Sequence, residues 1–222
     1  MRRRAKQRLS LLLLLMPALA VASSWPDTPL PSNTQTSDVA QHIVFNGLDM
    51  HAQVFSSQQS QQEIVAYYRK QWAPNVVVNQ MGSTEVVGHR DGDYYTTVQV
   101  SAVGGGSKGN IGIIDTSSAP KHPTLGSGLP APMGAKVYND ILYPDDPVPA
   151  RTVAMRDTLS PAQNTSYFSD HLVADGWKPA QTAACGEGPC IQRFERGDSQ
   201  LTLLVTRIGE GQSQVIMNVL KP

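Results

Sequence analysis

The chain has 222 residues, in which 18 Lys and Arg residues balance 18 Asp and Glu residues, and it has only two cysteines. Five of the basic residues lie within the first eight positions, so the rest of the chain carries 13 basic and 18 acidic groups, a net charge of −5. This mild acidity argues against nucleic acid or an anionic lipid surface as the partner. Beyond residue 22, no stretch reaches the length of a transmembrane helix.

Residues 1–22 have the pattern of a cleaved export signal. A basic start is followed by an apolar stretch that begins with Leu9–Leu15, and Ala20-Val21-Ala22 supplies the small residues of a cleavage site before Ser23. A membrane anchor is the alternative, but the apolar run is short and has no basic flank on its far side. We therefore expect a periplasmic or secreted protein.

The first part of the mature chain predicts two short strands. Residues 23–40 are rich in Pro, Ser and Thr and predict a flexible lead-in. Gln41–Phe45 and His51–Phe55 have strand character, and Asn46-Gly47 between them is a strong hairpin signal. Because Leu48 and Asp49 follow the turn, we expect a loop longer than the minimal hairpin.

An amphipathic helix is predicted over residues 60–73. Apolar residues recur every four positions from Ile64 to Trp72, and Ser60 with Glu63 forms the S-x-x-E capping pattern. Four segments rich in β-branched and aromatic residues follow, at Val76–Val78, Glu85–His89, Tyr94–Val100 and Ile111–Ile114. We interpret residues 41–115 as an α+β module of about ββαβββ, in which one helix covers one face of an antiparallel sheet.

The second half of the chain repeats this order. Residues 116–128 have linker composition, and Ser160 with Gln163 begins a second capped helix within residues 129–222. The aromatic pair Tyr167-Phe168 aligns with Tyr67-Tyr68 at an offset of 100 residues. The sequence therefore predicts two tandem copies of a small ββαβββ module, each with one helix packed on an antiparallel sheet.

Both cysteines lie where the second copy is longer than the first. The offset grows to 105 residues from Ile191 onward, so five extra residues enter between Trp177 and Ile191. We predict that Cys185 and Cys190 form a disulfide that closes an inserted loop, because paired cysteines are typical of exported chains. The alternatives are a metal site, which lacks further ligands nearby, and a redox pair, which favours C-x-x-C spacing.

No catalytic set is evident from the residue spacing. The five histidines show no metal-ligand spacing, and no G-x-S-x-G motif occurs. His89 aligns with Phe194, which indicates a structural role. The glycine-rich segment Gly104–Gly109 precedes a strand-like segment rather than a helix, so it predicts a hairpin tip and not a phosphate loop. We expect no catalytic residue, metal or cofactor.

Tyr94 and Tyr95 are the candidate partner-binding residues. Neighbouring residues of a strand point to opposite faces, so one of the two is expected on the face that the helix leaves uncovered. The alternative is a tyrosine that only shields its own strand. Uncovered sheet surfaces and free edges are common sites of association with another chain.

The composition and the motifs together predict an exported, non-enzymatic binding or assembly accessory protein of the bacterial cell envelope. Its partner would be another envelope or secreted protein. Two alternatives stay open from the sequence alone. One is a small secreted hydrolase with a site between the modules, and the other is an immunity or inhibitor protein that blocks a toxin or protease.

Overall fold

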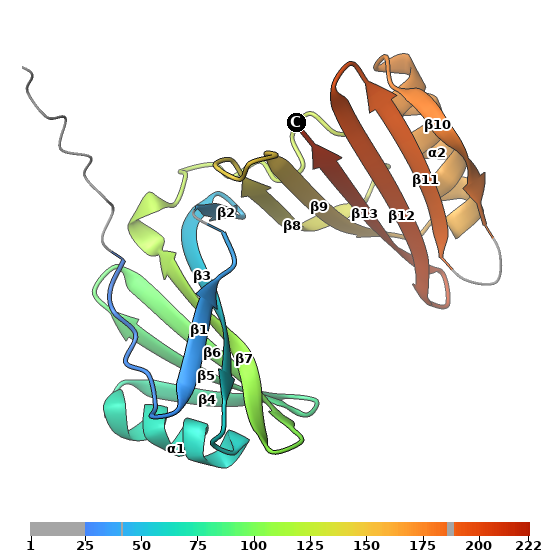
Figure 1. The fold of residues 1–222 in the computed structure, drawn as a ribbon. Helices are drawn as coiled ribbons and strands as arrows, with labels where there is room; N and C mark the ends of the chain where they lie inside the picture. Colours follow the sequence, from blue (N-terminus) through green and yellow to red (C-terminus); the bar gives the residue numbers. More distant parts are fainter. Residues whose placement is uncertain (1–24, 41, 186–188) are drawn as a thin grey trace, which may run out of the picture.

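The computed structural model describes residues 25–40, 42–185 and 189–222 (Figure 1). The predicted signal at residues 1–22 lies outside the described residues. The strands are β1 (Thr34–Asp38), β2 (Ile43–Phe45), β3 (Leu48–Ser57), β4 (Val76–Met81), β5 (Thr84–Asp91), β6 (Tyr94–Val103), β7 (Gly106–Asp115), β8 (Lys136–Tyr143), β9 (Ala150–Asp157), β10 (Lys178–Ala184), β11 (Cys190–Arg196), β12 (Ser199–Gly209) and β13 (Gln212–Leu220). The α-helices are α1 (Gln61–Gln71) and α2 (Pro161–Ala174), and a short 3-10 helix spans Thr116–Ser118.

All of these strands belong to one antiparallel sheet. Twelve of them run in the order β10-β11-β12-β13-β9-β8-β2-β3-β7-β6-β5-β4, and β1 pairs with β3 beside this path. Figure 1 shows two parts of the sheet meeting at an angle where β2 lies beside β8. At this join, Val44 pairs with Leu142 and Phe45 with Ile141.

The predicted fold of two tandem ββαβββ modules is therefore wrong. The described residues form one antiparallel 13-stranded sheet with two α-helices, and not two separate sheets with one helix each. The error arises because the outer edge of β2 pairs with β8, and such long-range edge pairing leaves no mark in local alternation. The internal repeat and the division into two domains stay predictions.

The segment predicted as a flexible lead-in contains a strand. Thr34–Asp38 forms β1, which pairs with the second half of β3. Trp25 stacks on His51 with ring centroids 6.0 Å apart and meets the edge of Tyr94 at the same distance. The polar sequence of β1 lacks the alternation of apolar residues by which strands are recognised, so its sequence did not predict it.

Both helices begin with the predicted capping box. The Ser60 hydroxyl accepts a hydrogen bond from the Glu63 amide, and the Glu63 carboxylate accepts from the Ser60 amide at 2.8 Å. Hydrogen bonds from Ser60 lower the pKa of Glu63. In α2, Ser160 and Gln163 make the same reciprocal contacts, and Pro161 occupies the first turn. These caps fix where each helix begins on the sheet.

Each helix packs against strands of its own half of the sheet. Under α1, the core joins Ile64, Tyr68 and Trp72 to residues of β5, β6 and β7. Burial raises the pKa of Tyr68, so its hydroxyl stays neutral. Under α2, Phe168 and Leu172 are fully buried against β11, β12 and β13.

The two helices cover the same face of the sheet. Residues that pair in register share a face, so the pairing can be followed from one core to the other. Every second residue of β3 from Phe55 of the first core back to Asp49 lies on the same face, and Asp49 pairs with Val44. Val44 pairs with Leu142, which connects through its partner on β9 to Val219 of the second core. No helix of the described chain packs on the opposite face, called here the uncovered face.

The join between the two parts is held by Asn46. Asn46 and Gly47 form a two-residue turn between β2 and β3, shorter than the loop predicted from sequence. The Asn46 amide donates to the Asp140 carbonyl at 2.8 Å, and the Asn46 side chain accepts from the Asp140 amide at 2.7 Å. Asn46 adopts φ +53°, a left-handed conformation that asparagine tolerates. One turn residue thus closes a hairpin and links β2 to β8.

Candidate functional site

The uncovered face carries much of the exposed apolar surface of the sheet. Six large apolar side chains on its strands are more than a third exposed: Val54, Val77, Met81, Tyr95, Val103 and Ile191. On β6 and β11 their positions alternate with buried residues of the helix-covered face. Soluble chains rarely leave large contiguous apolar patches exposed without a function, and such patches are typical of interaction sites.

The structure places the two candidate tyrosines on opposite faces. Tyr95 lies on the uncovered face and is 37% exposed, whereas Tyr94 lies on the face of the helices beside Trp25. A Cβ atom at position 88 would collide with the Tyr95 hydroxyl, so Gly88 gives the ring room to lie across β5. Of the two candidates, Tyr95 is therefore the one on the uncovered face, and the role of both tyrosines in partner binding stays a prediction.

A groove of about 550 Å³ lies beside Tyr95. Its wall comes from the start of β4 and from β5 and β6: Pro74, Asn75, Val76, Val77, Gly88, His89, Arg90, Gly92 and Tyr95. Val77 is 55% exposed within it. The groove presents an aromatic ring, aliphatic groups and one guanidinium, which suits a mixed apolar and polar side chain of a partner.

His89 helps to shape this groove from its covered side. Its ring stacks on Trp72 with centroids 5.1 Å apart, and its Nδ1 lies 2.8 Å from the Asn75 carbonyl oxygen. These contacts hold the end of α1 against the start of β4. They agree with the structural role inferred from the alignment of His89 with Phe194.

The charges on the uncovered face differ from those of the chain as a whole. Seven charged residues of the described strands point to this face: Arg90, Lys108, Lys136, Arg156, Lys178, Arg193 and Glu195. Six of them are basic, although acidic groups outnumber basic groups in the chain after residue 22. The uncovered face is therefore positive on a chain that is mildly negative.

The join gathers the polar groups nearest to a catalytic arrangement. His42 lies between two carboxylates, with Nε2 3.2 Å from Asp49 and Nδ1 3.3 Å from Asp145. The Asp49 amide donates to the Ser118 hydroxyl, which itself donates to the Asp115 carbonyl. The structure thus gives His42 two acidic neighbours, and it engages the Ser118 hydroxyl in backbone contacts.

A second polar pair is buried on the covered face near the join. The Arg151 guanidinium donates to both carboxylate oxygens of Asp140, at 2.7 and 2.9 Å, and the Gly126 amide donates to the same carboxylate. Burial raises the pKa of Asp140, but the hydrogen bonds from Arg151 and Gly126 outweigh it and leave the pKa below its ordinary value. This pair ties the predicted linker to β8 and β9.

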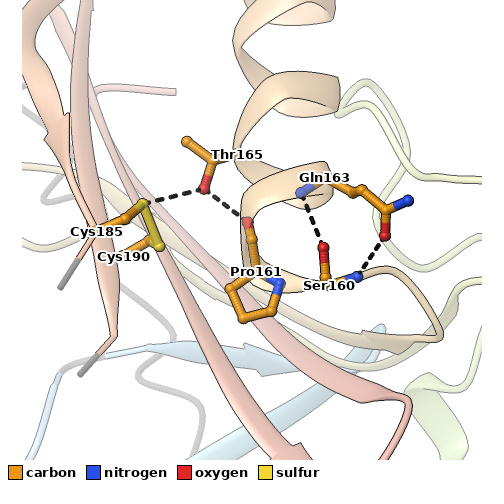
Figure 2. Close-up of a disulfide and its surroundings, with 6 residues drawn as sticks. All are labelled: Ser160, Pro161, Gln163, Thr165, Cys185 and Cys190. Carbon is orange, nitrogen blue, oxygen red and sulfur yellow. Dashed lines mark hydrogen bonds between the residues drawn. A yellow bond between two sulfur atoms is a disulfide. The ribbon is translucent and has the colours of Figure 1, made fainter. Parts of the chain in front are cut away.

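The predicted disulfide is present (Figure 2). Cys185 follows β10 and bonds to Cys190, which begins β11 and is 4% exposed. The Thr165 hydroxyl of α2 lies 3.8 Å from the Cys185 sulfur and donates to the Pro161 carbonyl. The bond connects two neighbouring strand ends beside α2, and such a bond is compatible with a secreted protein.

Within residues 25–40, 42–185 and 189–222, no group of three or more His, Cys, Asp or Glu side chains is arranged to hold a metal ion. In the same ranges, no helix is both long and apolar enough to cross a membrane.

The comparisons with known proteins assign no family. No family model, curated protein or solved structure matches the chain. The candidate site therefore rests on the residues of this chain alone.

Sequence reasoning named Tyr94 and Tyr95 as candidates but did not predict the surface that surrounds Tyr95. Strand alternation assigns each residue to one of two faces, and it cannot show that both helices cover the same face. The basic character of the uncovered face was hidden because its residues are spread over six strands. What the sequence does show is that each of these strands has a basic residue at a position that strand alternation assigns to the uncovered face.

Proposed function

We propose that the chain is an exported binding or assembly accessory protein of the cell envelope, and that it contacts a partner protein through the uncovered face. The observation that carries this proposal is the face itself, on which a continuous sheet exposes Tyr95, Val77 and four other large apolar side chains. Interfaces of this kind combine aromatic anchors with a polar rim. The disulfide supports an extracytoplasmic setting.

Tyr95 is the proposed anchor of the contact. Its ring is fixed over Gly88, it lies beside a groove, and more than a third of it is exposed. Burial of such a ring in an interface contributes about 2 kcal/mol, which corresponds to about thirtyfold in affinity.

The test uses photo-crosslinking in the native cell. A photoreactive residue replaces Val103 on the uncovered face, and in a matched control it replaces Gln62 on the outer side of α1. We expect a specific protein adduct from position 103 and none from position 62, and Tyr95→Ala should weaken the adduct. Tyr94→Ala is the paired control, because Tyr94 lies on the other face.

Two results would contradict the proposal. Equal adducts from positions 62 and 103 would show that the uncovered face has no special role. Absence of any adduct, together with hydrolytic activity that remains with the protein through purification to homogeneity, would favour the enzyme alternative. Circular dichroism of each variant establishes that it is folded.

A further inference from the structure

Four polar side chains meet on the second half of the uncovered face. Lys136 on β8 pairs in register with Arg156 on β9, which pairs with Gln214 on β13. Tyr138 occupies an irregular position in β8, and its hydroxyl accepts a hydrogen bond from the Gln214 side chain. The Arg156 guanidinium carbon lies 5.1 Å from the centre of the Tyr138 ring. We call these four residues the Lys136–Arg156 cluster.

The cluster holds two positive charges without a compensating negative one. Side chains that lie directly opposite on antiparallel strands have Cβ atoms about 5 Å apart, and like charges at such positions destabilise a sheet. Within the described chain, no carboxylate forms an ion pair with Lys136 or with Arg156. The Tyr138 ring holds the Arg156 guanidinium over its face, where the planar guanidinium can donate paired hydrogen bonds to an anion.

The first half of the sheet provides an internal comparison. In that half, β1 pairs with β3 as β8 pairs with β9 in the second half. Gln35 and Ser56 are opposite each other there, at the positions that correspond to Lys136 and Arg156. The next strand contributes Lys108 in the first half and Gln214 in the second. The close pair of cations is thus particular to the second half and is not imposed by the architecture.

We infer that the Lys136–Arg156 cluster binds carboxylate groups of the partner protein. The inference rests on the proposed function, because it concerns the same face and states the chemistry of the partner. A bound carboxylate would relieve the repulsion between Lys136 and Arg156 and accept paired hydrogen bonds from the guanidinium. The remaining basic residues of the face extend the same charge complementarity to a wider acidic surface.

An acidic protein fits this surface better than a polyanion does. The chain after residue 22 has a net charge of −5, so its long-range field opposes nucleic acid and anionic membranes. On the same face, strands β3, β4, β6 and β11 expose large apolar residues, and this mixture matches a protein surface of mixed character. Arg90, which lines the groove beside Tyr95, places a further cation next to the proposed anchor.

The test titrates the full mature chain, labelled with ¹⁵N, with a short polyglutamate peptide. We expect chemical-shift changes centred on the amides of β8, β9 and β13, and we expect them to weaken as salt is added. Lys136→Glu combined with Arg156→Glu should reduce the affinity about tenfold. Lys70→Glu combined with Lys121→Glu is the matched control, because it makes the same change in net charge at exposed positions outside the strands of the uncovered face.

Each outcome decides the inference. The inference is supported if polyglutamate causes chemical-shift changes at the cluster that the charge-reversal variant (Lys136→Glu with Arg156→Glu) loses. The control variant (Lys70→Glu with Lys121→Glu) should retain them. Equal loss in both variants would show a general attraction between net charges and would overturn it, as would binding to phosphatidylglycerol vesicles with no response to polyglutamate. If the reversal variant does not fold, Lys136→Gln with Arg156→Gln replaces it, with Lys70→Gln and Lys121→Gln as the control.

The outcome is separable from that of the proposed function. A protein adduct that depends on Tyr95, with no polyglutamate binding at the cluster, would retain the proposed function and reject the inference. Polyglutamate binding at the cluster, with no protein adduct in the cell, would retain carboxylate binding by the cluster and reject the proposed function.

Discussion

The helix-covered face and the uncovered face are built from alternate residues of the same strands, yet their charged side chains have different neighbours. On β6, Val98 and Val100 are fully buried under α1, while Tyr95 on the other face is exposed. On the covered face, the buried Asp140 has Arg151 as its partner. On the uncovered face, Lys136 faces Arg156, a second cation. The covered face therefore pairs its buried charge, whereas the uncovered face, which also buries Ile43 and Ala52, keeps two like charges opposite each other at this position.

The largest expected effect is a loss of stability when a core residue of the covered face is truncated. Phe168 is fully buried in the core under α2, so Phe168→Ala should lower the free energy of unfolding by about 3–5 kcal/mol through lost burial and a cavity. Val77→Ala removes an apolar group that is 55% exposed on the other face, and we expect a change of about 0.5 kcal/mol. Urea denaturation measures both. Similar losses from the two variants would mean that the faces do not differ as described.

The next effect concerns the buried ion pair and depends on pH. The pKa of Asp140 is lowered in the folded chain, so its stabilisation is present above the pKa of the unfolded state and is lost as pH falls through the folded value. Asp140→Asn should therefore cost about 2–3 kcal/mol near pH 7. The difference from the unaltered chain should begin to shrink below about pH 4, where the carboxyl of the unfolded chain becomes protonated, and it should be lost as pH falls through the lower pKa of the folded chain.

Urea denaturation at several pH values tests this dependence. Asp170→Asn, at an exposed position of α2, is the matched control and should show little change at any pH. A cost for Asp140→Asn that stays constant down to pH 3 would contradict the role of the ionised carboxylate.

The sequence predicted those parts of the fold that depend on local chemistry. The capping boxes at Ser60 and Ser160, and the position but not the length of the turn at Asn46-Gly47, are determined by residues within a few positions of one another. The disulfide between Cys185 and Cys190 followed from the expectation of export and from the presence of two cysteines. Each of these features is fixed by short-range geometry or by simple pairing, so the residue types alone were sufficient.

The parts that could not be predicted depend on long-range pairing. The join of Phe45 to Ile141 connects residues far apart in the chain through backbone groups, which every residue has. The same holds for β1, whose polar sequence TQTSD has no apolar alternation. For the site, adjacency in sequence placed Tyr94 and Tyr95 on opposite faces. The meeting of Lys136 with Arg156, however, required the register of β8 on β9.

The smallest expected effect sharpens the comparison from the uncovered face. Lys136→Gln removes one of two like charges that oppose each other across β8 and β9, so it should raise the free energy of unfolding by about 0.5 kcal/mol. Because the repulsion is between exposed charges, the gain should disappear at high salt. Lys121→Gln, in the exposed linker, is the control and should leave stability unchanged. Urea denaturation at low and high salt measures the difference. A loss of stability in Lys136→Gln would mean that Lys136 stabilises the fold, and the proposed difference in charge between the two faces would then fail at this position.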